Sequence, residues 1–407
     1  MRFVDLLKTT QEAVAQTLGE DYMNKSGLLK ATESFKIADV GEKILETENT
    51  VEPFTKSLIT VLAKTEMFDD EYNRKITSLW VDNFEWGGFV QRVYFGLADI
   101  IADPMYSLVN KKNYSEIDHT FYQPNTAAKI FQEGKAIMVP ISIVRDQLKE
   151  AFKSWDDLNR YVSGIRTTVR NTLNLALYSY QKMLVSCGIA MSVSTAATAL
   201  NNAVHLITEA KENGVIPNTV TTYNDIIALG DDAHRRFLTF VAQRIATIRD
   251  NMREFTTAYN DGNIPTFADG DNNRLLLNSQ FAKDIRFNAR ANTFNSNELA
   301  FGDYEEIPSW QAILSNDDAN DTFKFDTVTS INLAADATNK LGIGTEGLSK
   351  SGIIGVAFDR RAMGITLIRE KTTSTYTACA DFWNEFVHLL TNYILDTTFS
   401  LVAFVLD

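Results

Sequence analysis

The chain has 407 residues, of which 45% are hydrophobic and 22% charged, so it is globular and long enough to bury two or three cores. Its 39 basic and 52 acidic residues give a formal net charge of -13, which argues against a nucleic-acid reader. Two cysteines are too few for a disulfide framework, and Met1–Asp5 does not begin the apolar stretch of a signal peptide. We therefore expect the protein to be made and assembled in a reducing cytoplasm.

The first third of the chain is expected to extend away from a compact core. Residues 1–75 carry a weak apolar stripe at helical spacing, interrupted by Gly27 and Gly41, which indicates a helix-rich arm. The next segment is aromatic and β-branched, with strand-like stretches at 89–95 and 136–139 separated by polar, turn-rich residues. We therefore predict a long two-stranded excursion that contains these strands.

This excursion carries many aromatic side chains. A protruding hairpin is only marginally stable alone, so its aromatic residues need a surface to cover, and exposed apolar patches usually mark interfaces. The residues concerned are Trp80, Phe84, Trp86, Phe89, Tyr94, Phe95 and Tyr106. The alternative is an ordinary sheet within a single core.

The strongest local signal predicts one long helix. Ser154–Asp157 has the spacing of a capping box, and apolar residues then recur at helical intervals from Leu158 to Leu184. The predicted helix has roughly 30 residues, well above the usual length of 11 or 12. Asp156 and Asp157 in its first turn suit the helix dipole.

Residues 195–352 mix predicted helices, at 197–213 and 231–259, with loops rich in Asn, Asp, Gly and Thr, which indicates a separate α+β domain. The last segment is expected to form strands at 353–358 and 364–369, a helix at 380–395 and a strand at 399–405.

The most apolar long window of the chain, Leu389–Leu406, lies in that last segment. Asn392 and Asp396 interrupt it, and an Asp near a membrane centre costs roughly 3 kcal/mol. We therefore expect a buried segment there and no membrane span.

No motif predicts catalysis. Gly342–Gly347 matches the dinucleotide-binding pattern by letter, but a polar stretch precedes it and a strand follows, the reverse of the required context. The loops Asp269–Asn273 and Asn316–Asn320 lack the Gly and Glu that complete a calcium loop. Neither a nucleophile elbow nor a P-loop occurs.

The histidines and cysteines predict no metal or nucleophile site. His119, His205, His234 and His388 are far apart in the sequence, and His388 is expected to be a structural histidine. Cys187 and Cys379 lie in apolar surroundings and are expected to be buried, with no neighbouring base. We expect no enzyme, no cofactor and no metal.

Two segments resemble a known family. The stretch from Phe121 to Cys187 resembles the major capsid proteins of phi29-like short-tailed bacteriophages in a returning strand and in a set of packing residues around the long helix: Asp146, Leu148, Ala151, Phe152, Ser154, Trp155, Val162, Tyr180, Met183 and Leu184. The runs Phe358–Met363, Asp381–Asn384 and Phe399–Val405 look like the closing strands and helix of tailed-phage capsid proteins.

The resemblance implies an α+β, HK97-like capsid fold over the whole chain. Its parts are an N-terminal arm at 1–75, an extended loop at 76–140, a peripheral domain with the spine helix at 141–194, an axial domain at 195–352, and peripheral return strands and helix at 353–407. The chain stops at Asp407, without the immunoglobulin-like extension of the best-known members.

The implied function is that of a major capsid protein, which forms pentamers and hexamers of an icosahedral or elongated shell around double-stranded DNA. Its partners would be other copies of itself, scaffolding and portal proteins, and DNA without sequence specificity; no membrane is implied. It would reside in the virion after assembly in the host bacterial cytoplasm. An inner wall of the same sign as the net charge of -13 would repel DNA and let it slide.

The candidate inter-subunit contacts lie in the extended loop and in the closing segment. They are Phe89, Arg92, Tyr94, Phe95, Lys111, Lys112, Arg360 and Arg361. Some proteins of this fold crosslink through a loop lysine, but no partner pattern supports that role for Lys111 or Lys112, which we interpret as solvated loop-tip charges.

Two alternatives stay open at this point. A shell protein of an encapsulin-like nanocompartment would share the same subunit organisation and would differ in its contents. The second alternative, from a different functional class, is an α+β enzyme whose active site carries no recognisable motif. Such an enzyme is expected to be a monomer or small oligomer.

Overall fold

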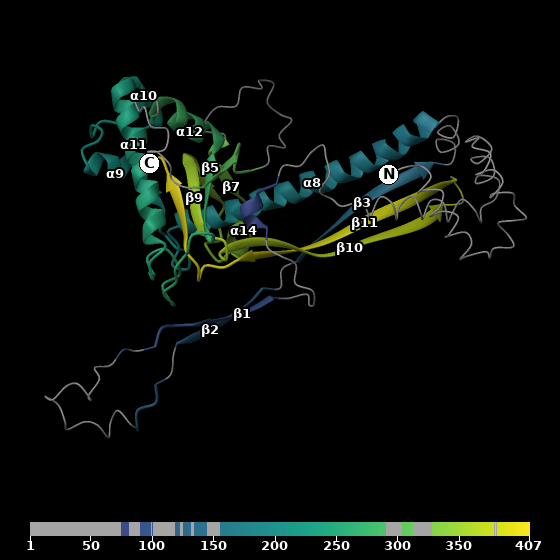
Figure 1. The fold of residues 1–407 in the computed structure, drawn as a ribbon, viewed down its shortest axis with the longest axis horizontal. Coiled ribbons are helices and arrows are strands. Elements are labelled where there is room, and N and C mark those ends of the chain that lie inside the picture. Colours follow the sequence, from purple (N-terminus) through teal and green to yellow (C-terminus); the bar gives the residue numbers. More distant parts are fainter. Residues whose placement is uncertain are drawn as a thin grey trace, which may run out of the picture.

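The computed structural model describes residues 75–80, 90–98, 100, 119–122, 125–131, 134–144, 155–289, 303–311, 328–377, 379 and 381–407. The predicted arm at 1–74 therefore lies outside the described residues. Figure 1 shows a compact lobe at one end, an elongated domain formed by a long helix and a sheet at the other, and a hairpin below the lobe.

The long helix is α8, Trp155–Val193, which confirms the predicted long helix. Its 39 residues exceed the predicted length and span about 58 Å at 1.5 Å per residue. The extension is at the C-terminal end, which enters the lobe and is buried nearly all round, so it shows little of the one-sided pattern of a surface helix. Gly188 lets the helix approach the sheet there, because a methyl group at this position would collide with the thioether of Met363.

Along its exposed length, α8 covers an antiparallel three-stranded sheet. The strand order is β10 (Met363–Thr377), β11 (Phe382–Leu395) and β3 (Gly134–Val144). One small core joins helix and sheet, formed by Val139, Val169, Leu173, Val387 and Leu389. Together they make the elongated domain.

The predicted helix at 380–395 is wrong, because this segment is the central strand β11. Phe382, Phe386 and Leu389 have helical spacing, but Trp383, Glu385 and Val387 are buried at every second position, as in a strand. The backbone of β11 pairs on both sides, with β10 and with β3. Bonds to two neighbouring strands outweigh the local helical pattern.

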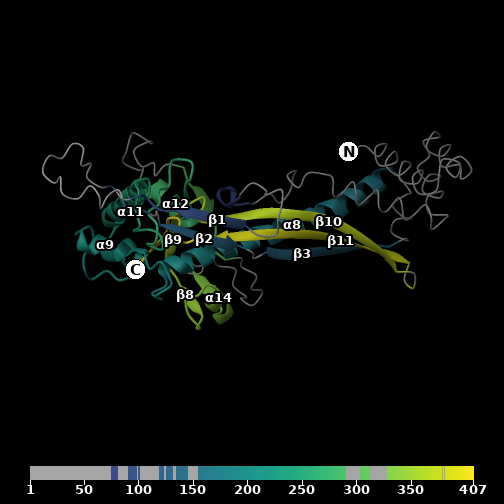
Figure 2. The same cartoon turned by 90° about the horizontal axis from the view of Figure 1, so that it is seen from below.

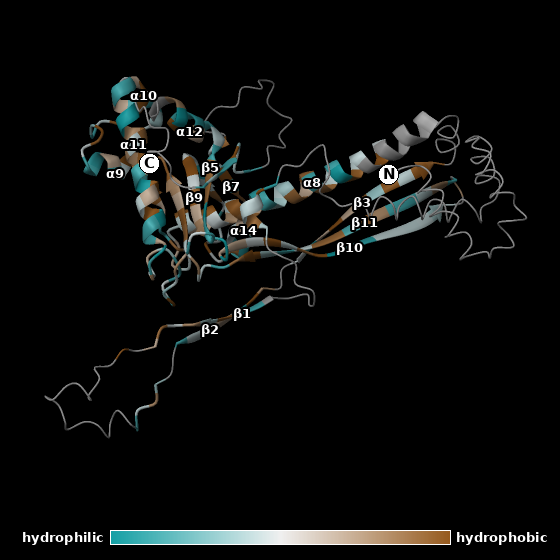
Figure 3. Cartoon of the chain, in the orientation of Figure 1, coloured by the Kyte–Doolittle hydropathy of each residue, from teal (hydrophilic) through white to brown (hydrophobic). Residues whose placement is uncertain are grey.

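The lobe contains a five-stranded sheet. Its order is β4 (Val204–His205), β12 (Leu401–Val405), β9 (Ile353–Asp359), β5 (Asn273–Asn278) and β6 (Glu305–Ile307), with β4–β12 and β5–β6 parallel and the other pairs antiparallel. Figure 3 shows the inner strand β9 as largely hydrophobic, and every residue of β9 and β12 is buried, as expected for strands covered on both faces.

Helices cover both faces of this sheet. On one face lie α9 (Leu206–Glu212), α10 (Tyr223–Ala228), α11 (Asp231–Asn251) and α12 (Ser279–Asp284). On the other face lies the C-terminal third of α8. The predicted helices at 197–213 and 231–259 are both shorter in the structure: turns and β4 replace the first part of one, and α11 ends at Asn251 because the chain turns back at Met252.

The remaining described elements are short. They are the 3₁₀ turn η1 (Thr77–Leu79), the π-turn η2 (Ile285–Ala289), helix α14 (Ala335–Lys340) and the strand pair β7 (Ile331–Leu333) with β8 (Leu348–Lys350). The dinucleotide-like run Gly342–Gly347 lies in the turn between α14 and β8, so it lacks the strand–turn–helix context.

The predicted return segment 353–407 is divided between the two sheets. Strands β9 and β12 pair in the lobe, whereas β10 and β11 pair in the elongated domain. The chain therefore passes between the domains twice in this segment, at 360–362 and at 396–400. These two connections hold the lobe against the elongated domain.

The hairpin consists of β1 (Val90–Phe95) and β2 (Thr126–Phe131), paired antiparallel. The prediction that residues 136–139 form the second strand of the excursion is wrong, since they belong to β3 of the elongated domain. In Figure 2, seen from below, the hairpin lies across the region where lobe and elongated domain meet. Within the described residues, no helix has the length and apolar composition to cross a membrane.

The packing of the lobe gives a first prediction. Phe404 of β12 is fully buried against the helices, so Phe404→Ala should lower the free energy of unfolding of the protein by about 3–5 kcal/mol, measured by urea denaturation. Phe95→Ala is the control, because Phe95 is 71% exposed and its removal should change stability little. Equal losses for both variants would contradict this account of the core.

Candidate functional site

The two connections between the domains are hydrogen bonded to each other. The N–H of Asp396 donates to the carbonyl of Ala362 at 2.7 Å, and the N–H of Asp359 donates to the carbonyl of Ser400 at 2.9 Å. The side chain of Asp396 is completely buried at this junction. A buried carboxylate is costly unless cations and hydrogen-bond donors surround it, so its partners identify what the junction holds.

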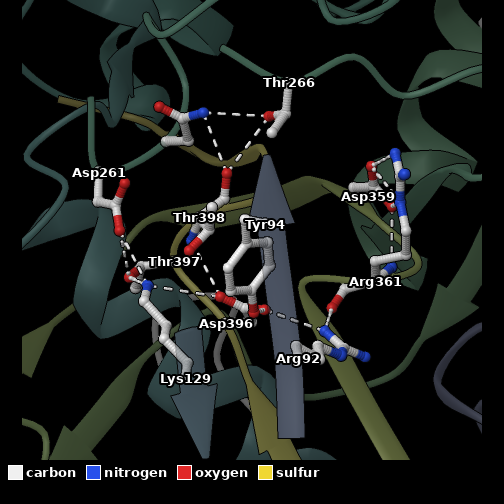
Figure 4. Close-up of polar contacts among 11 residues, drawn as sticks. Arg92, Tyr94, Lys129, Asp261, Thr266, Asp359, Arg361, Asp396, Thr397 and Thr398 are labelled. Carbon is white, nitrogen blue, oxygen red and sulfur yellow. Dashed lines mark hydrogen bonds and ion pairs between the residues drawn. The ribbon is translucent and has the colours of Figure 1, made fainter. Parts of the chain in front are cut away.

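Those partners come from the hairpin. The Asp396 carboxylate accepts hydrogen bonds from Arg92 Nη1 at 3.1 Å and from the Tyr94 hydroxyl, and Lys129 Nζ lies 3.5 Å away (Figure 4). The N–H of Thr398 completes the set at 3.1 Å. We call Arg92, Tyr94, Lys129 and Asp396 the hairpin anchor.

Strand geometry explains why three hairpin residues reach one carboxylate. Arg92 and Tyr94 are two positions apart on β1 and therefore point to the same side. Lys129 is the register partner of Arg92 on β2 and points to that side too. The anchor thus fixes both strands of the hairpin.

A second acid extends the network. Lys129 Nζ also donates to Asp261 Oδ2 at 2.9 Å and to Thr397 Oγ1 at 3.2 Å. Asp261 lies in the loop after α11, so the lysine ties the hairpin to the lobe as well as to the junction.

A neighbouring arginine supports the anchor from the other side. Arg361 forms a two-point ion pair with the buried Asp359, at 3.0 Å through Nε and 2.6 Å through Nη2. Its guanidinium lies 4.5 Å from the centre of the Phe399 ring, and this ring makes an edge contact with Tyr94 at 5.7 Å. The carbonyl of Arg361 accepts from Arg92 Nη1 at 2.5 Å.

The anchor also changes the acidity of the phenol. Burial raises the pKa of Tyr94, and the hydrogen bond to and negative charge of Asp396 raise it further. Tyr94 therefore keeps its proton and acts as a neutral donor to the carboxylate.

The opposite face of the hairpin is uncovered. Val93 and Ile130 are 53% and 63% exposed, and Phe95 is 71% exposed. The apolar exposed residues of the hairpin and its adjoining segments, which we call the outer hairpin face, are Val93, Phe95, Leu97, Ile100, Phe121 and Ile130. A monomer rarely presents so many apolar side chains on one projection.

The structure brings three of the predicted contact residues together. Arg92 and Tyr94 belong to the hairpin anchor, and Arg361 lies against it; their polar groups are engaged within the chain. Arg360 donates to the carbonyl of Trp80 at 3.2 Å, and Phe95 lies on the outer hairpin face. Phe89, Lys111 and Lys112 lie outside the described residues.

Sequence reasoning missed the acids of this site. In the sequence, Asp396 is visible only as a charge that interrupts the apolar window Leu389–Leu406. A carboxylate inside such a window must be paired when it is buried, which was the available signal. Nothing in the sequence pointed to Lys129, Asp261 or Asp359.

Two of the described histidines are held by side-chain hydrogen bonds. His234 bonds the Tyr223 hydroxyl at 2.8 Å, and His388 bonds Thr373 at 2.9 Å, as expected of structural histidines. In the described part of the chain no cluster of His, Cys, Asp and Glu could hold a metal ion. The prediction that Cys379 is buried is wrong, because it is exposed in the turn between β10 and β11.

Comparison with known proteins gives consistent matches. A family model described as Phi29-like phage major capsid protein matches residues 12–405. The major capsid protein of Bacillus phage PZA is 22% identical over 176 residues, which cover 42% of this chain but only 37% of that protein.

Two solved structures resemble the chain at low sequence identity. A chain of the capsid structure of Staphylococcus phage Andhra matches with a TM-score of 0.50 at 11% identity, covering 84% of this chain and 87% of that one. A chain in the structure of the head fiber and inner core protein of native bacteriophage P68 matches with a TM-score of 0.50 at 9% identity, covering 83% and 89%. At these identities the likeness concerns the fold.

Removing the central charge tests the hairpin anchor. Asp396→Asn should lower the free energy of unfolding by about 2–3 kcal/mol, because two partly buried cations lose their counter-charge. Amide hydrogen exchange in β1 and β2 should accelerate more than exchange in β9 and β12. Asp232→Asn, which changes an exposed acid paired with Arg235, should leave both patterns unchanged. Unaltered exchange in the hairpin of Asp396→Asn would refute the anchoring role.

Alkaline pH should loosen the same contact. The pKa of Tyr94 is higher in the folded chain than the ordinary value of 10.0, so its contribution is complete below about pH 10 and is lost as the pH rises above that value. The stability difference between the wild type and Tyr94→Phe should therefore begin to shrink near pH 10, where free phenols ionise, and should shrink further as the pH rises. Tyr122→Phe, at an exposed tyrosine, is the control in these urea titrations.

Proposed function

The chain belongs to the family of Phi29-like phage major capsid proteins, and we propose that it is the repeated subunit of a phage head shell. Its α+β fold is the HK97-like fold of phage capsid subunits, as expected from the sequence. The observation that best supports the shell function is a combination of two features. The hairpin anchor fixes one face of the hairpin to the domain junction, and the outer hairpin face is uncovered.

The hairpin suits a contact between copies of the chain. An isolated two-stranded hairpin is marginally stable in water, so it needs support from elsewhere. The hairpin anchor supplies this support on one face only, and the apolar outer hairpin face is left for a neighbouring subunit to cover. Burying a side chain the size of Phe95 would contribute roughly 1.5–3 kcal/mol to each such contact.

We propose domain roles that follow strand pairing. The lobe, including β9 and β12, would be the axial domain, and the three-stranded sheet with α8 would be the peripheral domain. Subunits so arranged would form pentamers and hexamers around the lobe, with the extended loop reaching a neighbour. Among the predicted contact residues, Phe95, Phe89, Lys111 and Lys112 would contact neighbouring subunits, whereas Arg92, Tyr94 and Arg361 would position the hairpin. Arg360, whose side chain lines a polar cavity of the lobe, would act there.

Further partners and location belong to the same proposal. We propose assembly in the host cytoplasm with scaffolding and portal proteins, and incorporation into the virion. The net charge of -13 supports an inner wall that repels packaged DNA and lets it slide. We also propose that the protein has no catalytic activity, and no comparison supports the nanocompartment or enzyme alternatives.

Assembly of purified protein tests the function. Negative-stain electron microscopy, with and without a scaffolding protein encoded beside the chain, should show closed shells or five- and six-fold capsomers. A stable monomer under every condition, with scaffold present, would count against a shell subunit.

A matched pair of variants tests the outer hairpin face. Phe95→Asp should abolish or strongly reduce shell formation without lowering the unfolding free energy of the subunit, because this side chain is exposed in the isolated chain. Phe95→Leu keeps an apolar group and should still assemble. Normal shells from Phe95→Asp would show that the face is not an interface.

A further inference from the structure

A polar cavity lies on the lobe beside the start of the described chain. Its volume is about 330 Å³, within the range of small-ligand sites. Parts of the chain that are distant in sequence form its wall: Thr77, Ser78, Arg274, Leu275, Asp303, Tyr304, Glu305 and Arg360. Two arginines and two acids face the same space, so their pairing decides what the cavity can bind.

One of the acids is already saturated. Glu305 Oε1 accepts from the N–H and hydroxyl of Thr77, at 2.9 and 3.0 Å. Its Oε2 accepts from the N–H of Ser78 at 3.1 Å and from the Ser78 hydroxyl. Four donors therefore satisfy this carboxylate, and none of them is an arginine.

The two arginines have no acid partner within the described chain. The Nε of Arg274 is buried without a hydrogen-bond partner, and Arg360 uses one nitrogen on the carbonyl of Trp80. Other arginines of the described chain do form ion pairs: Arg92, Arg235, Arg244, Arg253, Arg286 and Arg361. Within the described residues, therefore, two guanidinium groups without an ion pair line one cavity, in a chain with 52 acids and 39 bases.

Within the described residues, the remaining acid of the cavity, Asp303, forms no ion pair with Arg274 or Arg360. Asp303 is exposed, and its carbonyl, not its carboxylate, accepts from Arg249 at 3.3 Å. A buried Nε without a partner costs free energy until an acceptor reaches it. A planar guanidinium recognises oxyanions with two acceptor oxygens especially well.

We propose that this cavity binds an oxyanion, a phosphate or a carboxylate, through Arg274 and Arg360. The exposed Asp303 weakens the attraction, so binding is modest and falls with ionic strength. The anion has two possible sources: free inorganic phosphate, or an acidic side chain of a second copy of this acidic chain. The second source rests on the proposed shell function.

Phosphate titration of isolated subunits tests the site. At constant ionic strength, balanced with sodium chloride, inorganic phosphate should raise the thermal midpoint of the wild type and of Arg253→Gln, which alters an exposed, paired arginine. Arg274→Gln and Arg360→Gln should each raise the Kd for phosphate, obtained from this titration, about tenfold or more, as expected for a lost charge-assisted hydrogen bond. If Arg274→Gln does not fold, Arg360→Gln decides. A response of the same size in folded variants would mean an adventitious ion only and would overturn a phosphate site.

Shell assembly separates the two sources. Phosphate binding that persists in assembled shells indicates free phosphate. Binding that disappears in shells, together with slower assembly of Arg274→Gln but not of Arg253→Gln, indicates a carboxylate from a neighbour. Slower assembly of Arg274→Gln alone, without phosphate binding, supports the carboxylate too, whereas normal assembly and no phosphate binding overturn the proposal. Failure of the wild type to assemble would contradict the shell function but would leave phosphate binding by subunits intact.

Discussion

The buried carboxylate of Asp396 is the interaction on which the arrangement of this protein depends. It lies at a connection between the two sheets, and it can be buried only because Arg92, Tyr94 and Lys129 reach it from the hairpin. Withdrawing the hairpin would remove both cations and the phenol from this carboxylate and leave it the backbone N–H of Thr398. The hairpin position and the domain junction are therefore coupled.

Such a coupling has a cost as well as a use. Replacing a buried ion pair by well-packed apolar residues often leaves stability unchanged or improves it, so the charges are better explained by the geometry that they specify. An apolar patch could hold the hairpin in several registers, whereas a carboxylate with one arginine, one phenol and one lysine admits few. In the proposed shell, where each subunit would repeat one contact many times, a single hairpin direction would matter more than added stability.

The rest of the fold supports this rigid base. Helix α8 belongs to both domains, covering the three-stranded sheet along most of its length and the five-stranded sheet at its end. The chain crosses between the sheets at 360–362 and at 396–400, and hydrogen bonds tie the two crossings together. The result is an elongated body with an apolar projection, which is suited to building a larger assembly by contacts with its own copies.

The sequence by itself determined what depends on neighbours along the chain. Helix α8 was predictable because its hydrogen bonds join residues four apart and its apolar stripe repeats with the same period. The acidic composition and the absence of catalytic motifs were equally direct. The family resemblance rested on packing residues around that helix, and the family match extends over residues 12–405.

Only the tertiary structure decided what depends on distant partners. Phe382, Phe386 and Leu389 fit a helix as well as a strand, and it was pairing of β11 with β3 and β10 that chose the strand. The sequence revealed Asp396 as a charge in an apolar window, but its partners Arg92 and Lys129 lie 304 and 267 positions away. Strand pairing and buried charge pairing join residues whose separation leaves no periodic trace, so they become visible only when the chain is folded.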